Sequence, residues 1–321
     1  MNRSRAFGLD LESEFPIYGL PRAERSLNGR PTAVTLTSEE ALEETWRPAK
    51  PDRLADFRDP DGSLVLAIDR DDRLGYRLTS DEWGEYQLSP DGRHIDCAPP
   101  QLAWWRRERV LTGRALPLAA TLHGLEVFHA STVSFGDAAV AFVGPRQIGK
   151  TSVAVHLLLH GASFVTDDLL AMETAGGEII AHPGAAVIGV RPDEYRLIEP
   201  GKLRELGDFV ERLGKFFAEV ERVERPLPLR IVYFLSRRRT TRELTIEDMD
   251  PPDPRLLLAS SFFNSIVHSP ERLRGQLDLC SRLSQTALLC LVSVPPSVGA
   301  KQLAESLAEH ARERLGAAVG P

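Results

Sequence analysis

Short alternations of apolar and polar residues fill the first hundred positions of the chain. The clearest of these runs are residues 7–15, 64–68, 76–78, 85–88 and 94–97. Turns rich in Asp and Gly separate them, and a period of two residues is typical of a strand with one buried face. We therefore predict a small antiparallel sheet in this part. Residues 38–47 carry a helical pattern that begins with Ser38 as the N-cap.

Longer apolar segments follow after about residue 105. The predicted strands are residues 125–134, 138–143, 163–166, 229–236 and 288–294. The predicted helices are residues 101–123 (broken by Gly113 and Pro117), 151–160, 255–263, 270–286 and 300–315. Alternating strands and helices predict an α/β fold. We expect a small β-rich N-terminal domain over residues 1–105 and an α/β domain over residues 106–321.

One loop between a predicted strand and a predicted helix has the form GxxxxGK[ST], from Gly144 to Thr151. Such a loop turns its backbone N–H groups toward phosphate oxygens, and the helix that follows adds its positive end. We therefore predict a P-loop for ATP, in which Lys150 contacts the β- and γ-phosphates and Thr151 binds Mg²⁺. The predicted nucleotide-binding residues are Gly144, Pro145, Arg146, Gln147, Ile148, Gly149, Lys150, Thr151 and Ser152. The alternative is an ordinary turn with an exposed lysine.

Two adjacent carboxylates, Asp167 and Asp168, end the strand that follows the predicted P-loop helix. A P-loop protein needs one acidic residue at a neighbouring strand end for Mg²⁺. A second carboxylate is available to accept a proton from an attacking hydroxyl or water. The alternative is a strand-ending turn, a common use of Asp. His129 lies in the predicted strand before the loop, where a lone histidine is more often a structural residue.

Together these residues resemble the HPr kinase/phosphorylase family, whose P-loop fold is shared with phosphoenolpyruvate carboxykinase. His129 precedes Gly144 by fifteen residues and Lys150 precedes Asp167 by seventeen, and both spacings match those of the family. The resemblance is specific over residues 125–192 and looser elsewhere. The segments 7–16 and 226–235 are similar to a divergent branch that includes serine kinases of ribosomal-peptide pathways, some of which phosphorylate a lasso-peptide precursor.

The resemblance implies a P-loop kinase core and a reaction between Mg·ATP and a Ser or Thr hydroxyl of a protein or peptide. It implies that Asp167 is the general base and that Asp168 holds Mg²⁺ with Thr151. It also implies that Lys150 contacts the γ-phosphate and that His129 lines the catalytic pocket. Members of the family often assemble, so a homo-oligomer is expected by analogy alone.

The chain departs from the family pattern in two places. Residues 145–148 stand where the bacterial regulator usually has an Asp-Ser-Gly type sequence. The regulator's glycine-rich signature, which carries a glutamate ligand to Mg²⁺, has no clear counterpart after the Asp pair, although Glu194 or Asp193 occupies that region. Because that signature is associated with the reverse reaction, phosphorylase activity and HPr itself as substrate are both less expected.

A charged and helix-prone stretch covers residues 201–225, with Gly207 and Gly214 as hinges. It is either a flap that faces the substrate and carries Lys215, or a plain surface helix. Two other functions also fit the motifs. One is a kinase for a small hydroxylated metabolite, and the other is a non-catalytic ATP-dependent switch that binds a peptide. The second carboxylate argues against the switch, which has no need of a base.

The overall composition narrows the class of protein. Hydrophobic residues make up 42% of the chain and charged residues 26%, which is ordinary for a globular protein. The net charge of −7 gives no global reason to expect nucleic-acid binding. The three cysteines lack a CxxC spacing, so neither a disulfide framework nor a zinc site is expected. With no run of about 20 apolar residues, we expect no membrane span and a cytoplasmic protein.

Overall fold

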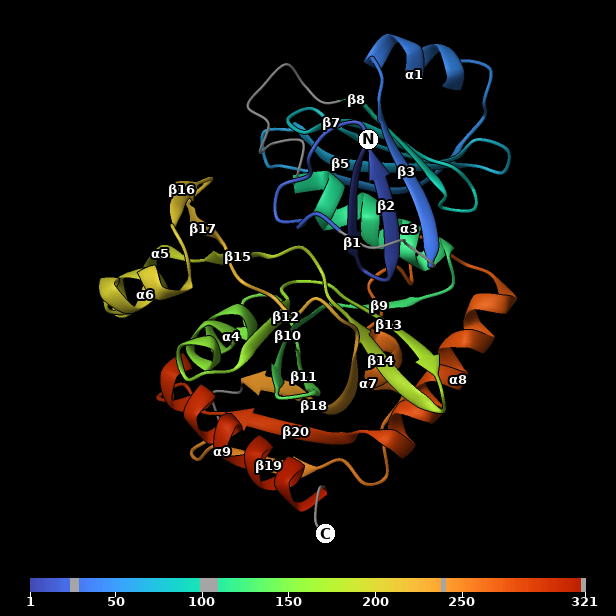
Figure 1. Cartoon of the computed structure of the whole chain (residues 1–321). Coiled ribbons are helices and arrows are strands. Elements are labelled where there is room, and N and C mark those ends of the chain that lie inside the picture. The colour runs from blue at the N-terminus through green and yellow to red at the C-terminus, as the bar shows by residue number, and fades with distance from the viewer. Residues whose placement is uncertain (24–28, 99–108, 238–240, 319–321) are drawn as a thin grey trace. The chain divides into compact units, whose positions relative to one another are not determined.

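The computed structural model describes the whole chain except residues 24–28, 99–108, 238–240 and 319–321. It contains helices and several sheets, so the predicted α/β class is confirmed. The chain folds into two compact units (Figure 1), Met1–Val127 with Phe262–Gly275 and Phe128–Ser261 with Gln276–Pro321. The predicted boundary after residue 105 falls among the residues outside the described part and stays a prediction.

The first unit is built on a sheet with the strand order β1-β2-β3-β8-β7-β6-β5-β4. Its strands are β1 (Asn2–Ala6), β2 (Leu9–Ser13), β3 (Arg30–Leu36), β4 (Asp52–Arg58), β5 (Leu64–Asp71), β6 (Gly75–Ser80), β7 (Gly84–Leu88) and β8 (His94–Ala98). The last four of the predicted runs therefore do form strands. The predicted antiparallel pairing is confirmed for β4 to β8 and for β1 with β2, and it is wrong for β3, which pairs parallel with both β2 and β8. The long connection of residues 14–29 lets β3 return beside β2 in the same direction.

Of the strand predicted over residues 7–15, residues 9–13 form β2 and residues 7 and 8 do not belong to a strand. Phe7 and Gly8 have φ angles of 55° and 77° and make the tight turn between β1 and β2. Positive φ at both central residues is the geometry that joins two twisted antiparallel strands. The predicted strand is therefore confirmed over β2, and its first two residues belong to the turn that precedes β2.

The predicted helix after Ser38 is confirmed as α1 (Glu39–Trp46). The Ser38 hydroxyl accepts the backbone N–H of Ala41, which caps the helix start. At the other end, the indole N–H of Trp46 donates to the side-chain oxygen of Gln87 on β7, at 2.8 Å. This bond and the burial of Trp46 hold α1 to the sheet.

The described part of the helix predicted over residues 101–123 is continuous. It comprises the π-helical turn η1 (Leu111–Ala115) and α3 (Leu116–Leu122), and residues 101–108 lie outside the described part. The predicted breaks at Gly113 and Pro117 are wrong. Pro117 is the second residue of α3 and directly follows the π-helical turn. The N–H of Leu116 donates to the carbonyl of Leu111, and this wider turn accommodates the sequence.

The second unit contains the predicted alternation of strands and helices, and the division between the units falls within β9 (Glu126–Phe128). Its further strands are β10 (Ala130–Phe135), β11 (Ala138–Val143), β12 (Ser163–Thr166), β13 (Leu170–Ala175), β14 (Glu178–His182), β15 (Val187–Val190), β16 (Val210–Arg212), β17 (Lys215–Glu219), β18 (Leu227–Arg237), β19 (Thr245–Asp248) and β20 (Leu288–Val294). Its helices are α4 (Lys150–Leu159), α5 (Pro192–Leu197), α6 (Pro200–Leu206), α7 (Pro254–Ala259), α9 (Ala300–Ala318) and the later part of α8 (Pro270–Thr286).

In the main sheet of this unit, several strands end at the same edge. β11, β18 and β20 run parallel to one another. β10 is antiparallel to β11, and β12 is antiparallel to β10, so β12 runs in the direction of β11. The loops that leave β11 and β12 therefore emerge at the same edge of the sheet. The predicted P-loop begins at Gly144, the first residue after β11. The Asp pair begins at Asp167, the first residue after β12.

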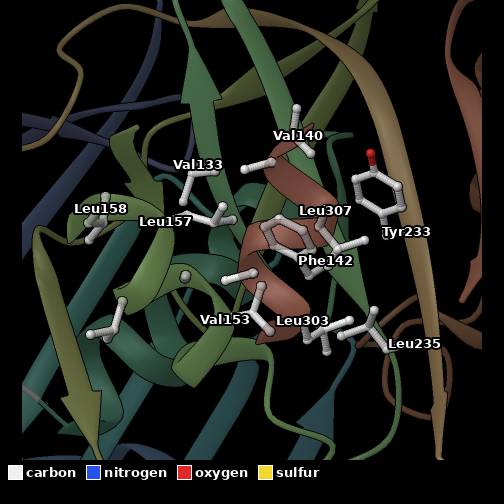
Figure 2. Close-up of a cluster of buried hydrophobic side chains, with 14 of the residues drawn as sticks. Val133, Val140, Phe142, Val153, Leu157, Leu158, Tyr233, Leu235, Leu303 and Leu307 are labelled. Atoms are coloured by element: carbon white, nitrogen blue, oxygen red, sulfur yellow. The ribbon is translucent and has the colours of Figure 1, made fainter. Parts of the chain in front are cut away.

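A buried apolar cluster fixes α4 against this sheet, and α9 packs beside it. Figure 2 shows side chains from β10, β11, β18, α4 and α9 meeting in this cluster. Those labelled are Val133, Val140, Phe142, Val153, Leu157, Leu158, Tyr233, Leu235, Leu303 and Leu307. Burial of each such side chain contributes about 1.5–3 kcal/mol relative to leaving it in water. The cluster thus holds the start of α4 in a fixed place behind the loop that precedes it.

The prediction of helix over residues 201–225 is correct only at its start. After α6, the chain forms a hairpin of β16 and β17 that joins β15 in a small sheet. Leu213 and Gly214 make its turn, with φ angles of 52° and 68°. The aromatic residues of β17 favour a strand, and Phe216 stacks on Tyr195 of α5 with ring centroids 3.8 Å apart. The plain surface helix is therefore excluded for this hairpin.

Candidate functional site

The loop between β11 and α4 has the backbone that the two glycines predict. Gly149 has a φ angle of 105°, which an L-residue rarely adopts, and it is the N-cap of α4. A Cβ on Gly144 would come within 2.8 Å of the backbone carbonyl of Leu235 in β18. Gln147 also has a positive φ, at 69°. The loop is therefore tightly curled, and glycine is required at both of its ends.

The start of α4 is suited to an anion. No side chain of the described residues caps it, so its first N–H groups are available to a ligand. Unsatisfied N–H groups and the positive end of the helix dipole together favour phosphate. Within the loop, Ile148 is buried in the core and anchors it, whereas the side chains of Pro145, Arg146 and Gln147 are exposed. Thr151 and Ser152 in the first turn are half-buried.

Lys150 is held inside the loop that precedes it. Its side-chain nitrogen donates to the backbone carbonyls of Gly144 and Pro145, at 3.0 and 3.3 Å. The residue is only 6% exposed, and this burial lowers the pKa of its ammonium group. The negative charges of Asp168 and then Asp167 act in the opposite direction. A buried cation held by neutral carbonyls is under-compensated, which favours the arrival of an anion.

Asp167 lies at the end of β12 and faces the first turn of α4. Its Oδ1 accepts the hydroxyl of Thr151 at 3.0 Å and the hydroxyl of Ser131 at 2.5 Å. Burial, and after it the charge of Asp168, raise the pKa of Asp167 to about 6. The two hydroxyl bonds and the charge of Lys215 partly oppose that rise. A carboxylate with this pKa is ionised at neutral pH and still a competent base.

The backbone at Asp168 is strained. Its φ angle is 65°, and the N–H of Leu169 donates to the carbonyl of Asp167 two residues back, at 2.8 Å. This is a γ-type turn, a conformation that costs free energy in a non-glycine residue and is found at functional sites. The hydroxyl of Thr166 donates to the carbonyl of Leu169 at 2.8 Å and supports the turn. The side chain of Asp168 is exposed, as a ligand to an added cation needs to be.

Ser131 is the site residue that sequence reasoning missed. It is fully buried in β10, and its hydroxyl bonds Asp167. The sequence held one signal for it, a polar residue in an apolar strand two positions after His129. Many buried serines are structural, so the sequence alone could not identify Ser131 as a site residue. Its contact with Asp167 follows only from the pairing of β10 with β12.

His129 does not lie on a strand, which corrects the sequence prediction. It occupies a bend between β9 and β10, and its backbone N–H donates to the carbonyl of Ser260 at 3.1 Å. The side chain is half-buried. Since β10 begins at the edge where β11 and β12 end, His129 starts from the same edge as the loop and Asp167. Its role in lining the pocket stays a prediction.

The two acidic candidates for an additional metal ligand are placed differently. The side-chain oxygen Oε1 of Glu194 is hydrogen-bonded to Nε2 of His156, at 2.8 Å. His156 lies on α4, six residues after Lys150. That pairing engages Glu194 away from the helix start. Asp193 is exposed, and its nearest ion-pair partner is Arg196, at 4.0 Å. Neither contact brings these carboxylates to Thr151 or to the Asp pair.

A second polar cluster lies at β19, β20 and α9. Ligand atoms of Asp248, Cys290 and His310 lie within 4.8 Å of one another. Arg314 forms an ion pair with Asp248, and the hydroxyl of Tyr233 bonds Nδ1 of His310 at 2.8 Å. Each of these two groups therefore already has a partner in the protein. All three cysteines, Cys97, Cys280 and Cys290, are buried thiols.

Among the described residues, no helix has both the length and the apolar character that crossing a membrane requires.

Comparisons with known proteins add little to this geometry. No family model matches the chain, and no curated protein matches it. Among solved structures, the chain is similar to the Hpr(Ser) kinase/phosphatase from Coxiella burnetii, with 13% sequence identity and a TM-score of 0.33. That likeness covers 60% of this chain and 99% of the other. A likeness this remote carries no argument about reaction or substrate, and the lasso-peptide branch stays a prediction.

Proposed function

We propose that the chain is a kinase that uses Mg·ATP to phosphorylate a Ser or Thr hydroxyl of a protein or peptide. The observation that carries the proposal is the meeting of Asp167 with Thr151 at the uncapped start of α4. A protein that only binds a triphosphate needs the loop and one acidic residue. A kinase needs in addition a base beside the transferred group, and Asp167 has the pKa of one.

The residues present fit a triphosphate with its metal. The uncapped N–H groups of α4 and the curled loop are suited to the phosphates, and Lys150 needs only to exchange the carbonyls of Gly144 and Pro145 for a γ-phosphate oxygen. Thr151 and Asp168 would hold Mg²⁺. A hydroxyl has one donor and two acceptor lone pairs, so Thr151 can bind a cation and still donate to Asp167. Bound Mg²⁺ neutralises charge on the β- and γ-phosphates.

Asp167 acts on the acceptor in this proposal. As the acceptor oxygen forms its bond to the γ-phosphorus, the bond from that phosphorus to the bridging oxygen breaks and ADP leaves. The proton of the acceptor hydroxyl passes to Asp167. Lys150 follows the transferred phosphoryl group and balances its charge. The protein or peptide nature of the acceptor is supported by the resemblance of residues 125–192 to HPr-kinase-like proteins.

The test is a transfer assay with γ-labelled Mg·ATP and three degenerate peptide libraries that fix Ser, Thr or Ala at the central position. We expect label in the Ser or Thr library above the Ala library, and none with Asp167→Asn. Calorimetry of both proteins with Mg·ATP checks that the variant still binds. If wild type binds Mg·ATP but labels no library, the peptide-kinase proposal is wrong, and label in a mixture of small hydroxylated metabolites would identify the other kind of kinase.

A further inference from the structure

Ser131 is not needed to bind a triphosphate, yet its side chain is committed to the site. It is 0% exposed, and its hydroxyl donates to Oδ1 of Asp167. Thr151 donates to the same oxygen. Among the described residues, the side-chain hydrogen bonds to this carboxyl both end on Oδ1. The carboxyl is therefore held by one oxygen from two directions, from β10 and from α4, while Oδ2 is left for another partner.

An irregularity in the sheet creates this contact. β10 and β12 pair as Ser134 with Ser163 and Val133 with Phe164, and the register then shifts so that Thr132 pairs with Thr166. Continued by one step, the shifted register sets Ser131 opposite Asp167. The unshifted register would set Ala130 there, which has no hydroxyl. Bulges of this kind are common beside active sites, where they re-aim a side chain.

We propose that Ser131 is a positioning residue that, together with Thr151, fixes Oδ1 of Asp167 and reserves Oδ2 for the acceptor hydroxyl. The inference rests on the proposed kinase function. A carboxyl without these bonds would rotate and present either oxygen at varying angles. Two hydroxyl donors from separate elements remove that freedom before the substrate arrives, and such preorganisation acts on the rate of transfer rather than on ATP binding.

The same strand supplies a matched control. Ser134 is 1% exposed, lies three residues from Ser131, and its hydroxyl has no hydrogen-bond partner among the described residues. Ser131→Ala and Ser134→Ala therefore remove the same group from the same strand at equal burial. Of the two hydroxyls, that of Ser131 bonds Asp167 and that of Ser134 does not.

The first experiment compares the kinetics of the two variants with wild type. We expect Ser131→Ala to lower kcat about 10- to 100-fold, the effect of one hydrogen bond to a charged group, with KM for Mg·ATP within about 2-fold. Ser134→Ala should stay within about 2-fold of wild type in both constants. Ser131→Cys, which keeps the volume and offers a weak donor, should fall between. Equal losses in the two alanine variants, or a loss carried by KM, would overturn the inference.

The second experiment separates the inference from the proposed function. Urea-unfolding midpoints are measured at pH 8 for wild type, Ser131→Ala, Asp167→Ala (which, unlike Asn, leaves no acceptor for the hydroxyl) and the double variant, and the same cycle is run with Ser134→Ala. We expect non-additive shifts for Ser131 with Asp167 and additive shifts for Ser134 with Asp167. Additive shifts in both cycles refute the Ser131 contact. A non-additive Ser131 cycle in a protein that transfers no phosphate refutes the kinase function and leaves the contact standing.

Discussion

Two carboxylates of the second unit sit in polar clusters of opposite character. Asp248 is paired with Arg314, and that bond is the leading cause that lowers its pKa. Asp167 receives only neutral hydroxyls, from Ser131 and Thr151, and burial raises its pKa to about 6. The first cluster is complete as it stands. The second holds a carboxyl under conditions that disfavour its charge, which is typical of a group kept for a reaction rather than for stability.

Lys150, like Asp167, is buried under conditions that disfavour its charged form. The cation is buried against neutral carbonyls, and two nearby carboxylates only partly offset the effect of burial. A cation and two carboxylates are thus gathered behind one loop without the direct ion pair that Asp248 and Arg314 form. The comparison predicts that substitutions around Asp167 change function strongly, whereas substitutions around Asp248 change stability slightly.

The largest expected effect is on transfer. Asp167→Asn keeps a carbonyl oxygen for the hydroxyls of Ser131 and Thr151 but removes the base, so kcat should fall by about 100- to 10,000-fold. Affinity for Mg·ATP should stay within about 3-fold. The assay is label transfer under saturating ATP, with calorimetry for binding. Asp248→Asn serves as the control, and transfer at the wild-type rate by Asp167→Asn would show that Asp167 is not the base.

Lys150→Met should abolish most ATP affinity while keeping the apolar stem of the side chain in the core. The lost ammonium group would otherwise contact the γ-phosphate, and a charge-assisted contact of this kind is worth roughly 1.5–3 kcal/mol, or about 10- to 150-fold in Kd. Titration calorimetry with Mg·ATP measures it directly. ADP should be affected less than ATP. An unchanged Kd for ATP would mean that Lys150 stays on the loop carbonyls when the nucleotide binds.

The sequence predicted the parts of this site that depend on local chemistry. The spacing of Gly144, Gly149, Lys150 and Thr151 predicted a curled loop at a helix start, which the φ angle of Gly149 confirms, while phosphate binding by that loop stays a prediction. Ser131 was missed because its role depends on the register shift between β10 and β12, which involves residues more than thirty positions apart. No local pattern records such a shift.

The errors in the fold have the same origin. Residues 210–219 are charged and helix-prone in isolation, yet they form a hairpin because Phe216 and its neighbours pack against α5 and β15. Phe7 and Gly8 were assigned to a strand because the apolar and polar alternation continues through their turn. For residues 210–219, tertiary contacts decided between two local conformations of similar propensity, whereas the turn at Phe7 and Gly8 is local.

The pH dependence of stability is the third test of the comparison. The folded pKa of Asp167, about 6, lies above the unfolded value of 3.8, so the folded state binds this proton more tightly. The associated stability is complete below about pH 4 and is lost as the pH rises through 6. Asp167→Asn should therefore be more stable than wild type at pH 8, by about 3 kcal/mol, and the difference should vanish below pH 4.

Urea unfolding at several pH values measures this difference, with midpoints and slopes compared between the two proteins. Ser134→Ala is a suitable control because its hydroxyl does not contact the carboxyl. Wild type and Asp167→Asn with parallel stability curves from pH 4 to 8 would mean that the folded protein does not raise this pKa. The kinase proposal would then lose the electrostatic part of its support.

Asp248→Asn should give the smallest effect, with the opposite sign. The pKa of Asp248 is lowered by the bond to Arg314, so its contribution to stability is present above the unfolded pKa and is lost as the pH falls through the folded one. Because the side chain of Asp248 is 47% exposed, solvent screens the pair and the loss at pH 7 should be less than about 1 kcal/mol. The difference from wild type should shrink below pH 4, where Asp167→Asn and wild type also converge. The quantity to compare is the slope, against pH, of the stability difference between each variant and wild type. Opposite slopes would show that Asp248 belongs to a completed structural pair and that Asp167 belongs to a site that needs a ligand. Slopes of the same sign would remove that distinction.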